Sequence, residues 1–216
     1  YDVNYVGHPL LDVLKNNQKL DEKREKIIAL LPGSRDQEIS KILPLMLNVV
    51  QDFKDYKFVI CGAPSKTKLY YKQYIKKINS NNIEIVQNQT YEILKKSYAA
   101  LVTSGTATLE AALFKTPQVV CYKSSWISFQ IGKFLVKNLK FISLVNLILD
   151  KPAVKELIQG ELNKNNIIRE LENILSDNGR KKVLNFYDDL EKLLSKEGAS
   201  KETAGKIINY HLEPNS

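Results

Sequence analysis

Short apolar runs alternate along this chain with segments whose apolar positions recur with a helical period. Several runs are continuously apolar, as expected for strands covered on both faces of a sheet. The runs are Ile27–Leu31, Phe58–Cys61, Ile83–Val86, Ala99–Thr103, Val119–Tyr122 and Phe141–Val145. The helix-like segments are Asp36–Phe53, Thr67–Asn79, Thr90–Ser97, Thr106–Phe114 and Ser125–Val136. This alternation predicts an α/β fold with a doubly wound, Rossmann-like parallel sheet.

The pattern changes after Asp150, where the apolar runs stop and only helical periodicity continues. The predicted helices there are Lys164–Leu175, Arg180–Leu194 and Ser200–Tyr210. We therefore expect residues 25–160 to form the Rossmann-like domain and residues 161–216 to pack on it as helices. Residues 1–24, with a charged stretch before the first strand, are interpreted as the entry or linker to this domain.

The composition narrows the class of protein without choosing a function. The chain has 44% hydrophobic and 26% charged residues and a formal net charge of +8. This excess of basic residues favours anionic partners, although scattered lysines are more often a solvated surface. Cys61 and Cys121 lack metal-binding spacing, which predicts buried free thiols, no zinc site and a reducing, cytoplasmic location. The longest apolar stretch is too short to span a bilayer.

A turn of small residues follows the first predicted strand. Gly33, Ser34 and Arg35 lead directly into a predicted helix. Glycine permits close backbone approach, a helix N-terminus offers N–H groups to an anion, and arginine can grip phosphate oxygens. Ser34 with Gln37 also fits a capping box that needs no ligand, so both interpretations stay open. No GxGxxG or GxxxxGK[ST] pattern occurs, so no dinucleotide cofactor or ATP site is predicted.

A second turn of this kind follows the fourth predicted strand. Ser104, Gly105 and Thr106 lead into the next helix, with Glu110 about one turn further on. The turn suits a phosphate, and Glu110 is placed to accept hydrogen bonds from vicinal hydroxyls such as those of ribose. Glu110 is equally interpreted as an acid that stabilises the first helical turn. Asn146 lies in an apolar run, where a ligand or the neighbouring backbone must meet its hydrogen bonds.

Four stretches together resemble the lipid-A-disaccharide synthase family, a glycosyltransferase family of the two-domain GT-B class. They are YVGHPLLD (5–12), ALLPGSRDQEI (29–39), LVTSGTATLEAALFKTPQVVCYK (101–123) and FISLVNLILDKPAVKELIQ (141–159), in the family's order and spacing. The resemblance is close over residues 5–159 and loose over the helical tail. It implies that the chain is the C-terminal, donor-binding half of such an enzyme.

The resemblance also implies an activity and roles for particular residues. The enzyme would transfer 2,3-diacylglucosamine from UDP to 2,3-diacylglucosamine 1-phosphate in lipid A biosynthesis, with no cofactor or metal. The residues implied to bind the UDP-sugar are Gly33, Ser34, Arg35, Ser104, Gly105, Thr106, Glu110, Asn146 and Gln159. Arg35 would stabilise the leaving diphosphate, and Glu110 would hold the ribose. The acceptor and the general base would belong to an N-terminal domain that we expect this chain to lack.

Other expectations concern the partners. The resemblance implies a homodimer that exchanges its final helices, and a peripheral position on the inner face of the bacterial inner membrane. The segment Ser125–Lys140 carries Trp126 and Phe129 among lysines. It is interpreted either as a helix that meets membrane or acyl chains, or, slightly preferred, as one that covers the sheet or the absent domain.

Two alternative functions stay open. A UDP-sugar 2-epimerase shares this architecture but needs a catalytic histidine, and neither His8 nor His211 is well placed. A non-catalytic nucleotide- or nucleic-acid-binding module would suit the charge, but it calls for aromatic residues interleaved with basic ones on a sheet face. The tyrosines of residues 70–74 fall instead at helical spacing, so no nucleic acid is expected as a partner.

Overall fold

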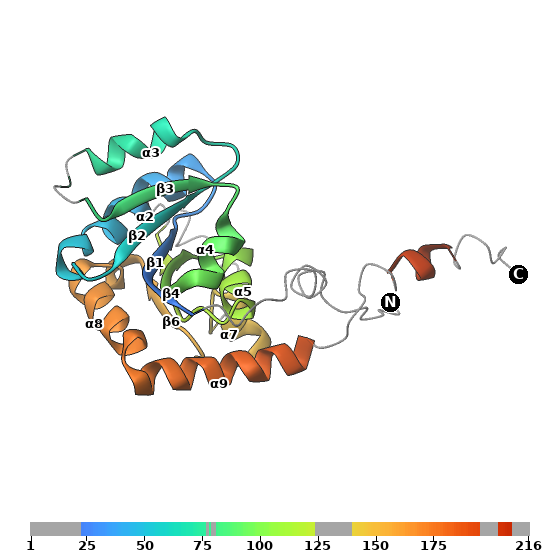
Figure 1. Cartoon of the computed structure of the whole chain (residues 1–216). Coiled ribbons are helices and arrows are strands. Elements are labelled where there is room, and N and C mark those ends of the chain that lie inside the picture. Colours follow the sequence, from blue (N-terminus) through green and yellow to red (C-terminus); the bar gives the residue numbers. More distant parts are fainter. Residues whose placement is uncertain (1–22, 77, 79–80, 124–139, 195–202, 209–216) are drawn as a thin grey trace, which may run out of the picture.

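The computed structural model describes residues 23–76, 78, 81–123, 140–194 and 203–208. In these residues six parallel strands form one sheet (Figure 1). The strands are β1 Glu25–Leu31, β2 Lys57–Gly62, β3 Ile83–Gln87, β4 Ser97–Thr103, β5 Gln118–Tyr122 and β6 Lys155–Ile158. Their order in the sheet is β3-β2-β1-β4-β5-β6. The direction of winding reverses between β1 and β4, and such a switch point is where doubly wound sheets bind ligands. The predicted fold class is confirmed.

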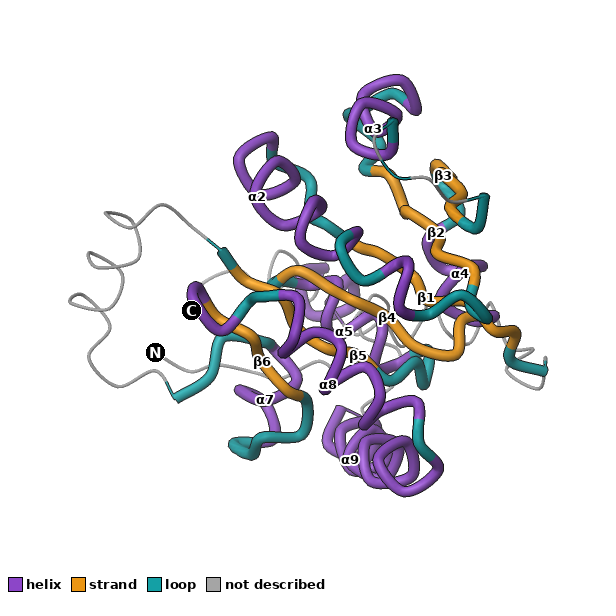
Figure 2. Tube along the Cα trace, turned by 90° about the vertical axis from the view of Figure 1, so that its left-hand side faces the viewer, coloured by secondary structure: helices purple, strands orange, loops and turns teal. Residues whose placement is uncertain are grey.

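Helices connect the strands and cover both faces of the sheet. The α-helices are α2 Asp36–Leu47, α3 Lys68–Ile75, α4 Thr90–Lys96, α5 Thr106–Leu113, α7 Leu144–Leu149, α8 Lys164–Leu175 and α9 Asp177–Leu194. Two short 3-10 helices, η1 Val50–Asp52 and η2 Gln159–Glu161, follow α2 and β6. Figure 2 shows the strands lying between helices, and Figure 1 places α3 and α9 at opposite ends of the molecule.

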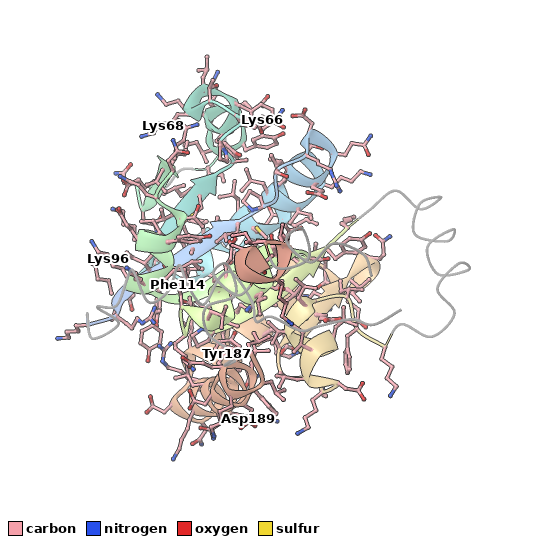
Figure 3. All side chains as sticks on the ribbon, turned by 90° about the vertical axis from the view of Figure 1, so that its right-hand side faces the viewer. Lys66, Lys68, Lys96, Phe114, Tyr187 and Asp189 are labelled. Atoms are coloured by element: carbon pink, nitrogen blue, oxygen red, sulfur yellow. The ribbon has the colours of Figure 1, made fainter. Side chains whose placement is uncertain are left out.

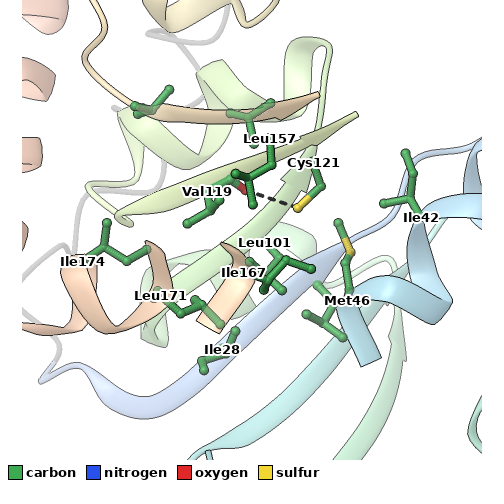
Figure 4. Packing of buried hydrophobic residues seen from close by; sticks show 14 of the residues in the cluster. Ile28, Ile42, Met46, Leu101, Val119, Cys121, Leu157, Ile167, Leu171 and Ile174 are labelled. Atoms are coloured by element: carbon green, nitrogen blue, oxygen red, sulfur yellow. Dashed lines mark hydrogen bonds between the residues drawn. The ribbon is translucent and has the colours of Figure 1, made fainter. Parts of the chain in front are cut away.

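The alternation of side chains along β1 explains why the strands are apolar throughout. Ile28 and Leu30 join one buried cluster with residues of α2 and α8, whereas Ile27, Ala29 and Leu31 join a second cluster with residues of α4 and α5. Successive side chains of a strand point to opposite faces, so a sheet covered on both sides needs apolar residues at every position. In Figure 4, Met46 of α2 and Ile167 and Leu171 of α8 pack over Ile28 and Leu101.

The structure corrects the sixth predicted strand. Residues 141–143 form a loop and α7 begins at Leu144, so the apolar run Phe141–Val145 is not a strand. The Ser143 side chain accepts a hydrogen bond from the Asn146 backbone N–H, which caps the helix in the usual way. The sixth strand is β6, which lies beyond Asp150, where no further strand was predicted. The predicted helix Asp36–Phe53 also ends earlier, at Leu47, and continues as η1.

A buried tyrosine connects the C-terminal helix α9 to the sheet. Tyr187 of α9 is fully buried, and its hydroxyl donates to the Thr116 carbonyl at 3.3 Å and accepts from Gln118 at 3.1 Å. Figure 3 shows Tyr187 on the side of α9 toward the sheet and Asp189 at the outer edge.

Residues 203–208 are helical. Among the described residues, no helix combines the length and apolar character needed to cross a membrane.

Arg24 is a structural residue that the sequence did not reveal. Its guanidinium donates to the carbonyls of Leu94 at 2.6 Å, Phe114 at 2.6 Å and Ser97 at 3.2 Å, and to the Thr116 hydroxyl at 3.1 Å. Burial lowers its pKa to about 10, and the nearby positive charge of Arg180 contributes to the shift. Arg24 therefore connects the first residues of the domain to the C-terminal ends of α4 and α5.

Candidate functional site

The first turn places Gly33 where only glycine fits. Its φ is 100°, and a Cβ there would lie 2.6 Å from the Glu38 carboxylate and 3.3 Å from the Thr103 methyl group. Arg35 is the N-cap residue of α2, and no side chain caps this helix. The capping box of Ser34 and Gln37 is therefore not formed. The amino end of α2 is left available to an anion, which is the other interpretation of this turn.

The second turn has the same design. Gly105 is the N-cap residue of α5 with φ 136° and ψ −162°, and again no side chain caps the helix. The Thr108 hydroxyl is buried and donates to the Gly105 carbonyl at 2.8 Å, so it does not face outward. Ser104 and Thr106 remain as the hydroxyl groups of this turn. Ser104 Oγ lies 3.5 Å from the Ile142 carbonyl, at the long limit of a hydrogen bond.

The two turns meet in one hollow of about 490 Å³ at the carboxyl ends of β1 and β4. Its lining includes seven of the predicted site residues: Gly33, Ser34, Arg35, Ser104, Gly105, Thr106 and Glu110. The end of β2 adds Cys61, Gly62, Ala63 and Pro64 to the same lining. The two turns that the sequence analysis singled out thus line one hollow, whereas the β2 loop was missed because these four residues carry no charged or hydroxyl side chain.

Arg35 lies at the mouth of this hollow. Its side chain is 83% exposed, and its guanidinium contacts the Glu38 carboxylate at 3.2 Å. An exposed ion pair of this kind contributes little to stability. Arg35 is therefore able to exchange Glu38 for another anion at low cost.

Glu110 lies deeper and is not a first-turn acid, since α5 begins at Thr106 with no acidic residue in its first turn. Burial raises the pKa of Glu110, and a hydrogen bond from Tyr91 opposes that rise. The Tyr91 hydroxyl lies 3.4 Å from Glu110 Oε1, and its ring packs on Phe114 with centroids 5.0 Å apart. A second hollow of about 380 Å³, lined by residues 88–92, shares Thr90 and Glu110 with the first.

Asn146 and Gln159 do not line either hollow. Asn146 is buried, and its amide is bonded to the Val154 backbone and to Glu156 within the chain. Gln159 begins η2 with φ 52°. The structure therefore brings seven of the nine predicted residues together and places these two on the β6 side of the sheet. The segment 124–139, which contains Trp126 and Phe129, lies outside the described residues.

Comparison with known proteins identifies the family. The family model described as "Lipid-A-disaccharide synthetase" matches residues 1–208. The lipid-A-disaccharide synthase of Syntrophus aciditrophicus is 36% identical over 209 residues, which cover 91% of this chain and 54% of that protein. The lipid-A-disaccharide synthase of Francisella tularensis subsp. novicida is 36% identical over 206 residues, with 89% and 54% covered. The chain thus spans about half the length of these relatives.

Solved structures share the fold at low sequence identity. The S. aureus MnaA–UDP co-structure aligns with a TM-score of 0.60 at 16% identity, covering 98% of this chain and 56% of that one. A Listeria monocytogenes protein, provisionally described as a UDP-N-acetylglucosamine 2-epimerase, gives 0.55 at 17% identity, covering 83% and 46%. These likenesses support the fold, whereas the family match favours the synthase over an epimerase. On its motifs, its fold and its relatives, the chain belongs to the lipid-A-disaccharide synthase family.

Proposed function

We propose that this chain is the donor-binding half of a lipid-A-disaccharide synthase and that the shared hollow holds UDP-2,3-diacylglucosamine. The observation that carries the proposal is the meeting of two glycine turns and Glu110 in one hollow. A diphosphate needs positive potential on more than one side, and a sugar ring needs an acceptor for its hydroxyls. The hollow supplies both within one binding site.

The diphosphate would lie between the amino ends of α2 and α5. Each helix directs N–H groups and the positive end of its dipole toward the hollow. Gly33 and Gly105 allow the phosphate oxygens to approach the backbone because neither has a side chain. Arg35 would leave Glu38 and bind the phosphate, where its charge stabilises the UDP leaving group.

The nucleoside would extend from the first hollow into the second. The Glu110 carboxylate lies where the two hollows join and would accept hydrogen bonds from the ribose hydroxyls. The uracil base would then occupy the hollow lined by residues 88–92. In this assignment, the backbone and polar side chains of that loop distinguish uracil from adenine.

The reaction proposed for the whole enzyme is a glycosyl transfer between two acylated sugars. The acceptor 6-hydroxyl forms a bond to C1 of the donor glucosamine, the C1–O bond to the diphosphate breaks, and UDP leaves. The hydroxyl proton passes to a general base, which we assign with the acceptor site to the part of the relatives that this chain does not span. We expect these 216 residues to bind UDP but to show no transferase activity, and robust turnover would contradict that assignment.

Calorimetric titration tests the donor site. UDP and UDP-N-acetylglucosamine should bind, and ADP should bind at least about tenfold more weakly. Arg35→Ala and Glu110→Ala should each weaken UDP binding by about tenfold, the equivalent of one charge-assisted hydrogen bond. Arg169→Ala is a matched control, because Arg169 is also an exposed arginine paired with a glutamate, Glu170, but lies on α8. Equal binding of ADP and UDP, or equal effects of Arg35→Ala and Arg169→Ala, would sink the proposal.

We propose in addition that the protein works in the cytoplasm at the inner face of the inner membrane. The support is the family's lipid substrate and the apolar, lysine-flanked segment Ser125–Lys140. Binding to anionic liposomes should fall when Trp126 and Phe129 are both replaced by glutamate. An unchanged affinity would remove this segment from the membrane contact.

A further inference from the structure

The Glu156 carboxylate on the edge strand accepts hydrogen bonds from the residues that lead into α7. Glu156 of β6 accepts hydrogen bonds from the Ile142 N–H at 3.0 Å, the Ser143 N–H at 2.9 Å and the Ser143 hydroxyl at 2.7 Å. Ser143 is fully buried. A carboxylate with several charge-assisted hydrogen bonds holds its partners in a narrowly defined position. Glu156 therefore fixes where residues 142 and 143 lie.

Asn146 completes the same arrangement. Its amide nitrogen donates to Glu156 Oε1 and to the Val154 carbonyl, both at 2.9 Å, and its amide oxygen accepts from the Val154 N–H at 2.9 Å. The residue is 1% exposed. Both the nitrogen and the oxygen of this amide thus have partners inside the chain, so Asn146 stabilises the loop around Glu156.

The loop held by Glu156 reaches the donor hollow at Ser104. The Ile142 carbonyl accepts from Ser104 Oγ at 3.5 Å, and α7 packs against α5, the helix that Gly105 caps. Ser104 lines the hollow beside Gly105 and Thr106. A shift of Ile142 would change both the orientation of the Ser104 hydroxyl and the support beneath the second turn.

We propose that Glu156 is a positioning residue for the donor site, which it serves by holding the Ile142–Ser143 loop against the Ser104 turn. Asn146 acts through Glu156 and does not touch the donor. The inference rests on the proposed function of the hollow. Supporting residues of this kind set the fraction of molecules whose site is ready to bind, and the apparent affinity falls in proportion to that fraction.

The test compares Glu156→Ala and Glu156→Gln with the parent chain of 216 residues. Glu84→Gln is the matched control, because Glu84 is a carboxylate on the opposite edge strand and pairs with Lys57. UDP affinity is measured by calorimetry well below the unfolding temperature. Amide hydrogen exchange is followed in parallel over residues 104–106, 141–143 and α8.

We expect Glu156→Ala to weaken UDP binding roughly tenfold, as if about one molecule in ten kept the loop in place. Glu156→Gln should weaken it about threefold, since the amide oxygen keeps the bonds to Ser143 while its NH2 group faces the Ile142 N–H. Exchange should accelerate at residues 141–143 and also at 104–106, with α8 and the control unchanged. A carboxylate that serves stability alone would lower the unfolding temperature without altering UDP affinity or exchange at 104–106.

Two results would overturn the inference. The first is faster exchange confined to residues 141–143 with UDP affinity within about twofold of the parent, in Glu156→Ala or, if that variant does not fold, in Glu156→Gln. The second concerns Asn146→Ala combined with Glu156→Ala. If the loss of affinity in the double variant is the product of the two single losses, the two residues act independently and Asn146 contacts the donor itself. Failure of the parent chain to bind UDP would instead refute the proposed function, and exchange at 104–106 would still report on the loop.

Discussion

Gly105→Ala separates backbone conformation from side-chain crowding at the proposed donor site. An added Cβ would meet nothing within 4 Å, so the substitution causes no clash. The backbone at φ 136° and ψ −162° is one that only glycine adopts readily. The expected cost is therefore purely conformational, about 1–3 kcal/mol of unfolding free energy. For a chain of this size, a loss of about 2 kcal/mol lowers Tm by roughly 4–8 °C.

Gly160→Ala is the control that makes this prediction specific. A methyl group added at Gly160 would also meet nothing within 4 Å, but the φ of this residue is not in the left-handed region. Urea unfolding should place Gly160→Ala within about 0.5 kcal/mol of the parent and Gly105→Ala clearly below it. UDP titration should show weaker binding for Gly105→Ala alone, because the N–H groups of α5 no longer point into the hollow. Equal stability and equal UDP affinity of the two variants would refute the reasoning.

Three further predictions concern the surroundings of the hollow. Arg24→Met removes the donor to three carbonyls and the Thr116 hydroxyl and should cost about 3 kcal/mol in urea unfolding, and a loss below about 1 kcal/mol would contradict this account. Burial raises the pKa of Glu110, so folding favours the protonated form of this side chain. The contribution of Glu110 to the free energy of unfolding is therefore present at low pH and is lost as the pH rises through the folded pKa. Glu110→Gln should therefore be at least as stable as the parent at about pH 7 while binding UDP about tenfold more weakly, and reduced thermal stability would count against it. Tyr91→Phe removes the hydrogen bond that opposes the rise in the Glu110 pKa, so the pH below which UDP binding weakens should move upward. Calorimetry as a function of pH checks this, and an unmoved midpoint would show that Tyr91 does not act on Glu110.

The strands in the middle of the sheet were predictable because their buried positions are apolar on both faces. Five of the six predicted runs are strands in the structure, with β1 and β4 in the centre of the sheet. The exceptions lie at the edge. The strand β6 has the sequence KELI, whose Lys155 and Glu156 are not buried, so it lacks the continuous apolar pattern. The run Phe141–Val145 resembles a strand, but Ser143 caps a helix within it.

The site was predictable where its chemistry is local. Gly33 and Gly105 each lie between a strand and a helix, and this spacing is visible in the sequence. The contacts that support the site are not local, because Glu156 meets Ile142 and Ser143 only once β6 pairs with β5. Tyr91 reaches Glu110 from another helix in the same way. No short spacing in the sequence encodes such pairs. The family resemblance implied that Asn146 binds the donor, whereas in the structure its side-chain amide is hydrogen-bonded to Val154 and Glu156.

The caps of the helices argue for a ligand in the hollows independently of the family. Three helices away from the hollows have side-chain caps, in which Thr67, Ser143 and Asn163 accept from backbone N–H groups of α3, α7 and α8. The three helices whose amino ends line the hollows, α2, α4 and α5, have no side-chain cap. A missing cap costs about 1 kcal/mol at each helix. Caps on α3, α7 and α8 beside uncapped amino ends on α2, α4 and α5 are what we expect if an anionic, hydroxyl-rich ligand accepts hydrogen bonds from those N–H groups.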